Sequence, residues 1–279
     1  MPEMLPEMST TSGFVEIHGC QFYYQVAGEG HPLVLLHAGI CDSRMWDDQW
    51  GVFAQRYRVV RFDMRGFGRS SPSASPFTPH EDLQGLLQFL DIHTSYLVGA
   101  SMGGQVALDF TLAQPEMVDA LILVGSALTD RRPSDALLQA WAQIGEALQA
   151  GDTAAANEIE LSLWVDGPRR SPDEVDHAVR SRVHEMNAVK LARHNPDGQP
   201  RGLEPPAAQR LAEIQVPTLV VAGVQDHADI LDSARQLADG IPHAQHIVIA
   251  GSGHLPSMEQ PAPFNRAVQT FLEPLDHGA

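Results

Sequence analysis

Short apolar runs alternate along the chain with longer amphipathic segments. Short apolar runs bounded by turn residues are typical of strands buried on both faces of a sheet. Runs of this kind, or alternating apolar and polar positions, predict strands over residues 14–18, 20–26, 33–36, 57–62, 95–98, 118–124, 216–222 and 246–249. The intervening segments predict helices over residues 43–55, 78–90, 103–113, 230–239 and 257–272. This alternation predicts an α/β fold with a mostly parallel eight-stranded sheet and helices on both faces.

The segment from about 128 to 212 departs from this alternation. It contains helical patterns such as Leu137, Trp141, Ile144 and Leu148, but no convincing strand. It is too long for an ordinary connection between two elements. Because it leaves the sheet at the carboxyl end of a strand, where ligands bind in open α/β folds, we expect it to form a helical cap over the site. A helical excursion with a purely structural role is the alternative.

These patterns divide the chain into three parts. Residues 1–13 are expected to form a disordered N-terminal extension, residues 14–127 with 213–273 the α/β core, and residues 128–212 the helical cap. The first twelve residues contain neither a basic stretch nor an apolar run, so we expect no signal peptide.

The charge balance narrows the possible partners. The 279 residues include 35 acidic and 18 basic side chains, which gives a net charge of −17 at pH 7. A uniformly acidic protein repels phosphate backbones and anionic lipids, so we expect binding to neither nucleic acid nor membranes. No apolar stretch approaches the roughly 18 residues that span a bilayer. We therefore expect a cytoplasmic monomer or homodimer that acts on a small molecule.

Cysteine usage gives no indication of a metal site. Cys20 and Cys41 are the two cysteines, and they are not spaced as a Cys-x-x-Cys pair. Neither a disulfide framework nor a zinc site is therefore indicated, and we expect no metal and no cofactor.

The most informative stretch is a glycine-flanked serine. Ser101 lies between Gly99 and Gly103, after the apolar run 95–98 and before the predicted helix 103–113. In a strand–turn–helix context, the Gly-x-Ser-x-Gly pattern holds the serine in a strained turn with its hydroxyl exposed. The small neighbours allow the strand and the helix to pass closely. The pattern therefore predicts Ser101 as a nucleophile.

A serine hydroxyl is a weak nucleophile and needs a base, which a third group orients. His254 follows the strand 246–249 through a glycine-rich turn and is the predicted base. Asp226 follows another apolar run at a turn, and the order Ser, Asp, His along the chain favours it as the orienting acid. Asp130, after the strand 118–124, is the alternative acid.

Acyl chemistry at Ser101 also requires donors for the developing oxyanion. We expect one donor to be the backbone N–H of Met102, at the start of a helix whose dipole favours negative charge. The second donor is expected in the loop after the strand 33–36, with Gly39 preferred and Ile40 as the alternative. His37 is expected to shape this loop rather than act as a second base.

With these motifs the chain resembles the α/β-hydrolase superfamily over about residues 14–273. Residues 37–39 resemble its H-G-x loop, with Ala38 in place of the usual glycine, and residues 62–70 resemble its D-x-R-G-x-G-x-S turn. The resemblance implies the same roles for Ser101, Asp226 and His254, and a cap domain inserted after strand six. The chain looks most like the enol-lactonase, small-ester esterase and cofactor-free perhydrolase branches.

A serine at the nucleophile position argues against the related haloalkane dehalogenases and epoxide hydrolases, which place aspartate there. We expect cleavage of a small carboxylic ester or lactone through an acyl-enzyme on Ser101. The alternatives are a cofactor-free perhydrolase or haloperoxidase, a carbon–carbon bond hydrolase with the same triad, and a non-enzymatic ligand receptor.

The sequence only suggests which side chains contact the substrate. The candidates are Ile40, Trp164 and Met186. Four arginines in the predicted cap could bind a substrate carboxylate, although solvation is the simpler interpretation; these are Arg131, Arg132, Arg180 and Arg182.

Overall fold

The computed structural model describes residues 9–128, 132–193 and 198–276. In these residues an eight-stranded sheet has the order β1-β2-β4-β3-β5-β6-β7-β8. β2 runs antiparallel to β1 and β4, and the other pairings are parallel, as the sequence predicts. The strands are β1 (Thr10–Ile17), β2 (Cys20–Ala27), β3 (Pro32–Leu36), β4 (Arg58–Phe62), β5 (Ser95–Ala100), β6 (Val118–Val124), β7 (Thr218–Gly223) and β8 (Gln245–Ile249).

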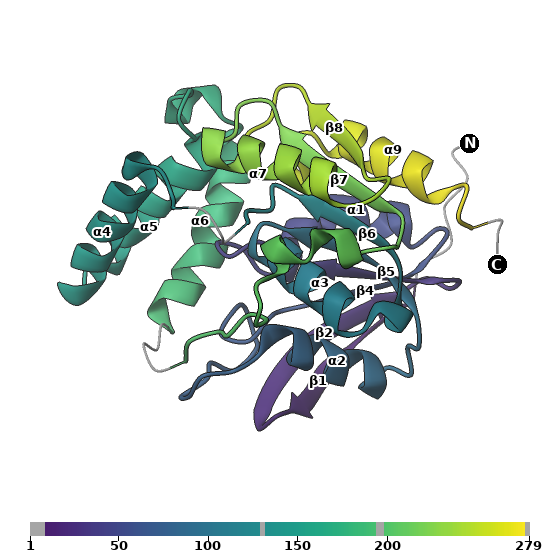
Figure 1. The fold of residues 1–279 in the computed structure, drawn as a ribbon. Helices are drawn as coiled ribbons and strands as arrows, with labels where there is room; N and C mark the ends of the chain where they lie inside the picture. The colour runs from purple at the N-terminus through teal and green to yellow at the C-terminus, as the bar shows by residue number, and fades with distance from the viewer. Residues whose placement is uncertain (1–8, 129–131, 194–197, 277–279) are drawn as a thin grey trace, which may run out of the picture.

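Helices cover both faces of the sheet (Figure 1). Within the central strands, successive side chains enter different apolar clusters: Leu33 and Leu35 pack on one face, and Val34 and Leu36 on the other. This alternation follows from the two-residue period of a strand. One cluster lies against α1 (Asp47–Phe53), α8 (Pro256–Glu259) and α9 (Pro261–Leu272). The other lies against α2 (Pro79–Phe89), α3 (Met102–Ala113) and α7 (Ala228–Gly240).

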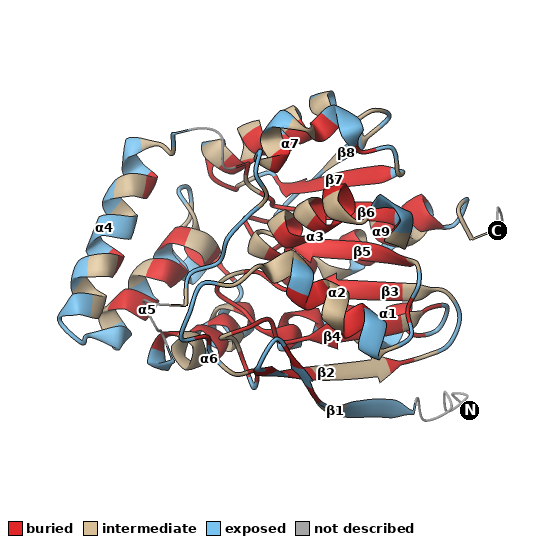
Figure 2. Ribbon diagram, turned by 60° about the horizontal axis from the view of Figure 1, so that its bottom comes forward, coloured by how far each residue is buried: buried red, intermediate tan, exposed pale blue. Residues whose placement is uncertain are grey.

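Burial is greatest in the middle of the sheet (Figure 2). β5 and β7 are buried throughout, whereas most of β1 is exposed or half-buried. Strands buried on both faces read as continuous apolar runs, which explains why the central strands were predictable from the sequence.

Between β6 and β7 the described residues form a helical insertion beside the sheet (Figure 1). It contains α4 (Asp135–Gln149), α5 (Thr153–Leu161), a π-helical turn (Ser162–Asp166) and α6 (His177–Ala192). A small apolar cluster joins these helices through residues that include Leu137, Ile144 and Leu163. Val183 and Met186 of α6 instead join the apolar cluster of the core. Division of the chain at residues 128 and 212 remains a prediction.

Three elements differ most clearly from the prediction. The expected disorder of residues 1–13 is wrong for its last part, because β1 begins at Thr10 and pairs there with Ala27 of β2. The helix predicted over 43–55 is a 3₁₀ turn (Ser43–Trp46) followed by α1. The closing helix is interrupted at Gln260, because Pro261 begins α9 and proline cannot continue a helix.

In the described ranges, no helix combines the length and the apolar character needed to cross a bilayer.

Candidate active site

Ser101 lies in the turn between β5 and α3 and has the backbone angles φ 51° and ψ −112°. Positive φ is uncommon for a residue with a side chain, so the surrounding structure must hold it. The Ser101 N–H donates to the carbonyl of Val124 at 2.7 Å. A Cβ at position 103 would lie 2.5 Å from the Leu36 carbonyl oxygen, and a Cβ at position 99 would collide with the Gly103 carbonyl. Close backbone packing therefore fixes the turn.

The structure brings the three predicted side chains into one hydrogen-bonded chain. Ser101 Oγ lies 2.9 Å from His254 Nε2. His254 Nδ1 lies 2.9 Å and 3.2 Å from the two carboxylate oxygens of Asp226. An ionised carboxylate only accepts hydrogen bonds, so Nδ1 donates to Asp226 and Nε2 is left to accept the Ser101 proton.

Asp226 and His254 come from adjacent loops at the carboxyl ends of β7 and β8. Asp226 is 1% exposed and His254 4% exposed. The backbone N–H of His227 also donates to Asp226 Oδ1 at 2.8 Å, which fixes the carboxylate. The alternative acid, Asp130, lies outside the described residues.

The loop after β3 lies against the start of α3. A Cβ on Gly39 would be 3.5 Å from both Cβ and Sδ of Met102. Met102 is the first residue of α3, and the first backbone N–H groups of a helix have no hydrogen-bond acceptor within the helix. These positions agree with a role of Met102 and Gly39 in binding an oxyanion, with Ile40 as the alternative second donor; the assignment remains a prediction.

His37 stabilises this loop. Its Nδ1 lies 2.9 Å from the Ala38 carbonyl oxygen, and the Met64 N–H donates to its Nε2 at 2.9 Å. Nδ1 therefore carries the proton. Burial lowers the pKa of His37 below its ordinary value, although its bond to Ala38 and the charges of Asp63 and Asp42 oppose this effect. A neutral, fully bonded imidazole fits the structural role expected from the sequence.

The candidate substrate contacts lie in different places. The Trp164 ring is 4.5 Å from the His254 ring, between centroids, at an interplanar angle of 37°. Met186 is buried, and its sulfur accepts a hydrogen bond from the Asp42 N–H at 3.5 Å. Ile40 is buried in the same apolar cluster as Met186. Of the three, Trp164 is the one that contacts the predicted base.

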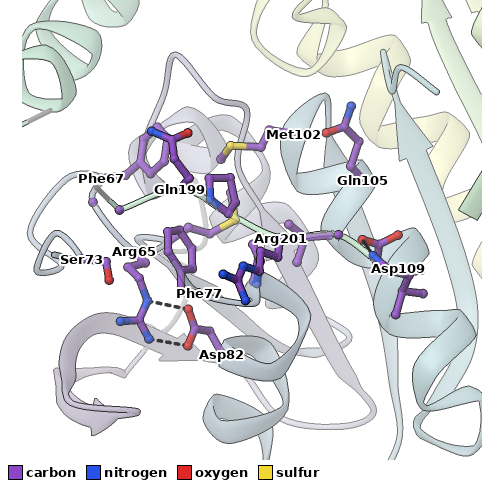
Figure 3. A pocket seen from close by; sticks show the side chains of 18 of the residues that line it. Arg65, Phe67, Ser73, Phe77, Asp82, Met102, Gln105, Asp109, Gln199 and Arg201 are labelled. Atoms are coloured by element: carbon purple, nitrogen blue, oxygen red, sulfur yellow. Dashed lines mark hydrogen bonds and ion pairs between the residues drawn. The ribbon is translucent and has the colours of Figure 1, made fainter. Parts of the chain in front are cut away.

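A cavity of about 550 Å³ lies beside α3 and reaches the serine turn at Met102 (Figure 3). Trp164, Met186 and Ile40 do not line it, and neither do Ser101, His254 and Asp226. Its walls are formed by the loop after β4, by α2, by the start of α3 and by residues 198–208. The apolar side chains facing it include Phe62, Met64, Phe67, Phe77, Val106 and Leu128.

One face of α3 forms a wall of this cavity. Met102, Gln105, Val106 and Asp109 follow the helical spacing and all line it. Asp109 accepts a hydrogen bond from the Leu203 N–H, and desolvation raises the pKa of its carboxyl group. The helical pattern was visible in the sequence, but the segment that covers it, residues 198–208, comes from a distant part of the chain. The sequence interpretation therefore missed this cavity.

The arginines considered as carboxylate anchors have partners within the protein. Arg180 pairs with Asp166 and Glu158, and Arg182 pairs with Asp48. Arg132 forms an exposed pair with Asp135, and Arg131 lies outside the described residues. Arg193 and Arg201 line the cavity, and neither forms an ion pair with a described residue. The Arg193 guanidinium donates hydrogen bonds to the carbonyl oxygens of Gly68 at 2.6 Å and Ser70 at 3.4 Å. Figure 3 shows Arg201 beside Phe77.

Among the described residues, no group of three or more His, Cys, Asp or Glu side chains is arranged to hold a metal ion.

The strained serine turn, the order of the strands and the placement of histidine and aspartate on the last two loops define an α/β hydrolase. A family model for the alpha/beta hydrolase fold matches residues 31–261, and the chain belongs to that family.

Relatives differ in the reactions that their names give. The chain is 29% identical, over 91% of its length and 92% of the relative's, to 2-hydroxy-6-oxononadienedioate/2-hydroxy-6-oxononatrienedioate hydrolase 2 of Pseudomonas putida. A solved structure described as Est816, an N-acyl homoserine lactone degrading enzyme, has a TM-score of 0.70 and 28% identity and covers 93% of this chain and 100% of its own.

The enol-lactonase of Burkholderia xenovorans LB400 has a TM-score of 0.78 and covers 94% of this chain and 100% of its own. At 22% identity this likeness concerns the fold. Together the relatives establish a hydrolase and leave the bond that it cleaves open.

Proposed function

We propose that this chain is a serine hydrolase that cleaves a small carboxylic ester or lactone. The observation that carries the proposal is the continuous path from Ser101 Oγ to His254 and on to Asp226, with heavy-atom distances of 2.9 Å at each closest contact. The strained backbone at Ser101 directs the hydroxyl toward the His254 imidazole, and the hydroxyl makes no capping hydrogen bond to α3.

In the proposed reaction, Ser101 Oγ attacks the substrate carbonyl while His254 Nε2 takes its proton. The oxyanion forms beside the Met102 N–H and a second amide from the loop after β3, either Gly39 or Ile40. Buried Asp226 stabilises the imidazolium that results. His254 then protonates the departing alkoxide, and water activated by the same imidazole hydrolyses the acyl-enzyme.

The cavity beside Met102 offers space for one part of the substrate. Its walls are largely apolar, as expected for a small-molecule pocket. Because it reaches the serine turn through Met102, a substrate bound there would direct its carbonyl toward the proposed oxyanion site. We therefore favour substrates with an apolar group of moderate size over acetate esters of small alcohols.

Hydrolysis of a carbon–carbon bond is the second candidate. The relative from Pseudomonas putida is named for a hydrolase of dienedioates, which carry two carboxylates. Arg193 and Arg201, which lack a described carboxylate partner, line the cavity and could bind such a group. In this reaction the same triad would serve a vinylogous diketone instead of an ester.

A substrate panel separates these candidates. It contains p-nitrophenyl acetate and hexanoate, γ- and δ-lactones, an N-acyl homoserine lactone and a 2-hydroxy-6-oxo-dienoate. We expect the highest kcat/KM for a neutral ester or lactone with a medium acyl chain. A preference for the dienoate by more than about tenfold, roughly 1.4 kcal/mol, would favour the second candidate.

Two controls complete the test. Ser101→Ala measures the background, and turnover that is equal in both proteins for every substrate would instead favour a ligand-binding receptor. Arg201→Gln should raise KM for the dienoate but leave the neutral esters unchanged. Halogenation of monochlorodimedone in acetate and peroxide measures the perhydrolase alternative directly.

A further inference from the structure

The loop that carries His254 is held by one buried carboxylate. Glu259 Oε1 accepts hydrogen bonds from the backbone N–H groups of Gly253 at 3.0 Å and Leu255 at 3.2 Å. Oε2 also lies within hydrogen-bond distance of the Gly253 N–H, at 3.1 Å. The Glu259 side chain is 5% exposed. Because the two bonded residues are the immediate neighbours of His254, this carboxylate restricts the backbone from which the imidazole extends.

The helical insertion supplies the counter-charge. Arg170 Nη1 donates to Glu259 Oε2 at 2.5 Å. Its other nitrogens donate to the carbonyl oxygens of Val165 at 2.7 Å and Asp166 at 3.0 Å. A Cβ at position 253 would collide with the Arg170 guanidinium, so a larger residue there would displace the arginine. The arginine thus connects the π-helical turn of the insertion to the histidine loop.

The same π-helical turn contacts the rest of the triad. The Leu163 carbonyl accepts a hydrogen bond from His227 Nε2 at 2.7 Å, and the His227 N–H donates to Asp226. Trp164 stacks on His254 and lies 5.4 Å from the His227 ring. π-helical turns are rare and occur frequently at functional sites. Three successive residues of this turn, 163–165, therefore contact the loop that carries Asp226, the His254 ring and the Arg170 guanidinium, in that order.

We propose that Glu259 and Arg170 are positioning residues that align His254 with Ser101 and couple that alignment to the helical insertion. The proposal rests on the proposed serine hydrolase function. A displacement of about 1 Å of a reacting group can lower a rate about 100-fold, so the ion pair acts on turnover more than on substrate binding.

Graded substitutions separate the bonds between Glu259 and the histidine loop from the ion pair between Glu259 and Arg170. Glu259→Ala removes both amide bonds and the ion pair. Glu259→Gln keeps an oxygen for the two amides but places an NH₂ group against Arg170. Arg170→Met leaves the carboxylate on the histidine loop and removes only the link to the insertion. We expect kcat for an ester to fall by about 100-fold for the first variant and about 10-fold for the others, with KM changed less than about threefold.

Glu160→Gln is the matched control, because it removes the charge of a buried carboxylate that lies in the insertion and away from the triad. Glu160 pairs with Lys190 at 2.8 Å and contacts Asn187, without touching a described triad residue. Glu160→Gln should lower the thermal midpoint as the Glu259 variants do, yet keep kcat within about twofold of wild type. Arg170→Lys, which keeps the charge, should recover part of the loss seen in Arg170→Met.

Two further measurements keep the proposal testable whatever the substrate is. One is the rate at which a fluorophosphonate labels Ser101, and the other is the NMR signal of the His254 Nδ1 proton. We expect slower labelling and a broadened or shifted signal in Glu259→Gln and Arg170→Met, but not in Glu160→Gln. If Glu259→Ala does not fold, Glu259→Gln and Arg170→Met still test the proposal.

The outcomes are distinct. A wild-type protein that neither turns over esters nor reacts with the phosphonate contradicts the proposed function, while the Nδ1 signal still tests the positioning. An unchanged signal together with kcat values equal to those of Glu160→Gln overturns the positioning role. A rise in KM at constant kcat overturns it as well.

Discussion

Ser101 and His254 meet at 2.9 Å, but the structure holds them by different means. The serine turn is held by backbone contacts with no space for side chains at Gly99 and Gly103. The histidine loop is held by charge, through Glu259 and an arginine 84 positions before His254 (254 − 170). The serine side is therefore held by backbone packing against neighbouring strands of the sheet, whereas the histidine side depends on a side-chain ion pair with the helical insertion.

This difference suggests unequal sensitivity to substitution. Substitutions of Gly99 and Gly103 in the serine turn should affect folding and chemistry together, because the same backbone contacts support both. Substitutions that loosen the histidine loop but keep the buried carboxylate paired, such as Arg170→Lys, should affect chemistry first.

Removal of the hydroxyl should have the largest effect. Ser101→Ala should lower kcat/KM for an ester by up to about 10⁶-fold, because no acyl-enzyme can form. The unfolding midpoint should hardly change, since the side chain supplies none of the backbone contacts of the turn. Steady-state kinetics and thermal unfolding measure the two effects. Retention of more than about 1% of activity would contradict the role of Ser101.

Substitution of the proposed acid, Asp226, should have the second largest effect on activity. Asp226→Asn keeps an oxygen for the His227 N–H but presents an amide that favours the wrong imidazole tautomer. We expect kcat to fall by about 10⁴-fold with a folded protein, as judged by circular dichroism. Full activity in this variant would transfer the role to Asp130, and Asp130→Asn is the matched comparison.

Backbone packing of the serine turn can be tested by its effect on stability. Gly103→Ala places a methyl group 2.5 Å from the Leu36 carbonyl oxygen, so we expect a loss of about 2–4 kcal/mol in the free energy of unfolding. Gly145→Ala in α4 is the control, because nothing lies within 4 Å of the added Cβ. That variant should gain about 0.5–1 kcal/mol. Urea titrations measure both, and equal effects would refute the steric account.

A smaller effect concerns pH. Burial lowers the pKa of His37, so below an ordinary value of about 6.5 the unfolded chain binds a proton that the folded protein does not. The contribution of His37 to stability is therefore complete above that pH and is lost as the pH falls toward the lowered value. His37→Gln should flatten the decline in unfolding free energy below about pH 6.5. Urea titrations at several pH values measure this decline. If the unfolding free energy of His37→Gln falls with pH as steeply as that of wild type, His37 is not the source of the decline.

The same contrast explains what the sequence could predict. The central strands and the contact among Ser101, His254 and Asp226 were predictable, because apolar runs, glycine spacing and the order of the three residues are local or follow the strand order. Two features were not predictable: the cavity, which needs residues 198–208 to cover α3, and the Arg170–Glu259 pair. No periodicity connects an arginine in a loop of the insertion with a glutamate at the end of α8. The start of β1 was also missed, since Thr10 pairs only because β2 extends to Ala27.

The helical insertion begins and ends at neighbouring strands, because β6 and β7 pair directly. This connectivity makes the segment exchangeable in principle: an insertion from another hydrolase could be grafted between the two strands without changing the sheet. The ion pair at Glu259 sets a condition on such chimaeras. A donor segment without a guanidinium at the position of Arg170 would leave a carboxylate buried without a counter-charge beside His254, at a cost of several kcal/mol. Recombination of specificity within this family would therefore depend on whether the incoming segment supplies that arginine.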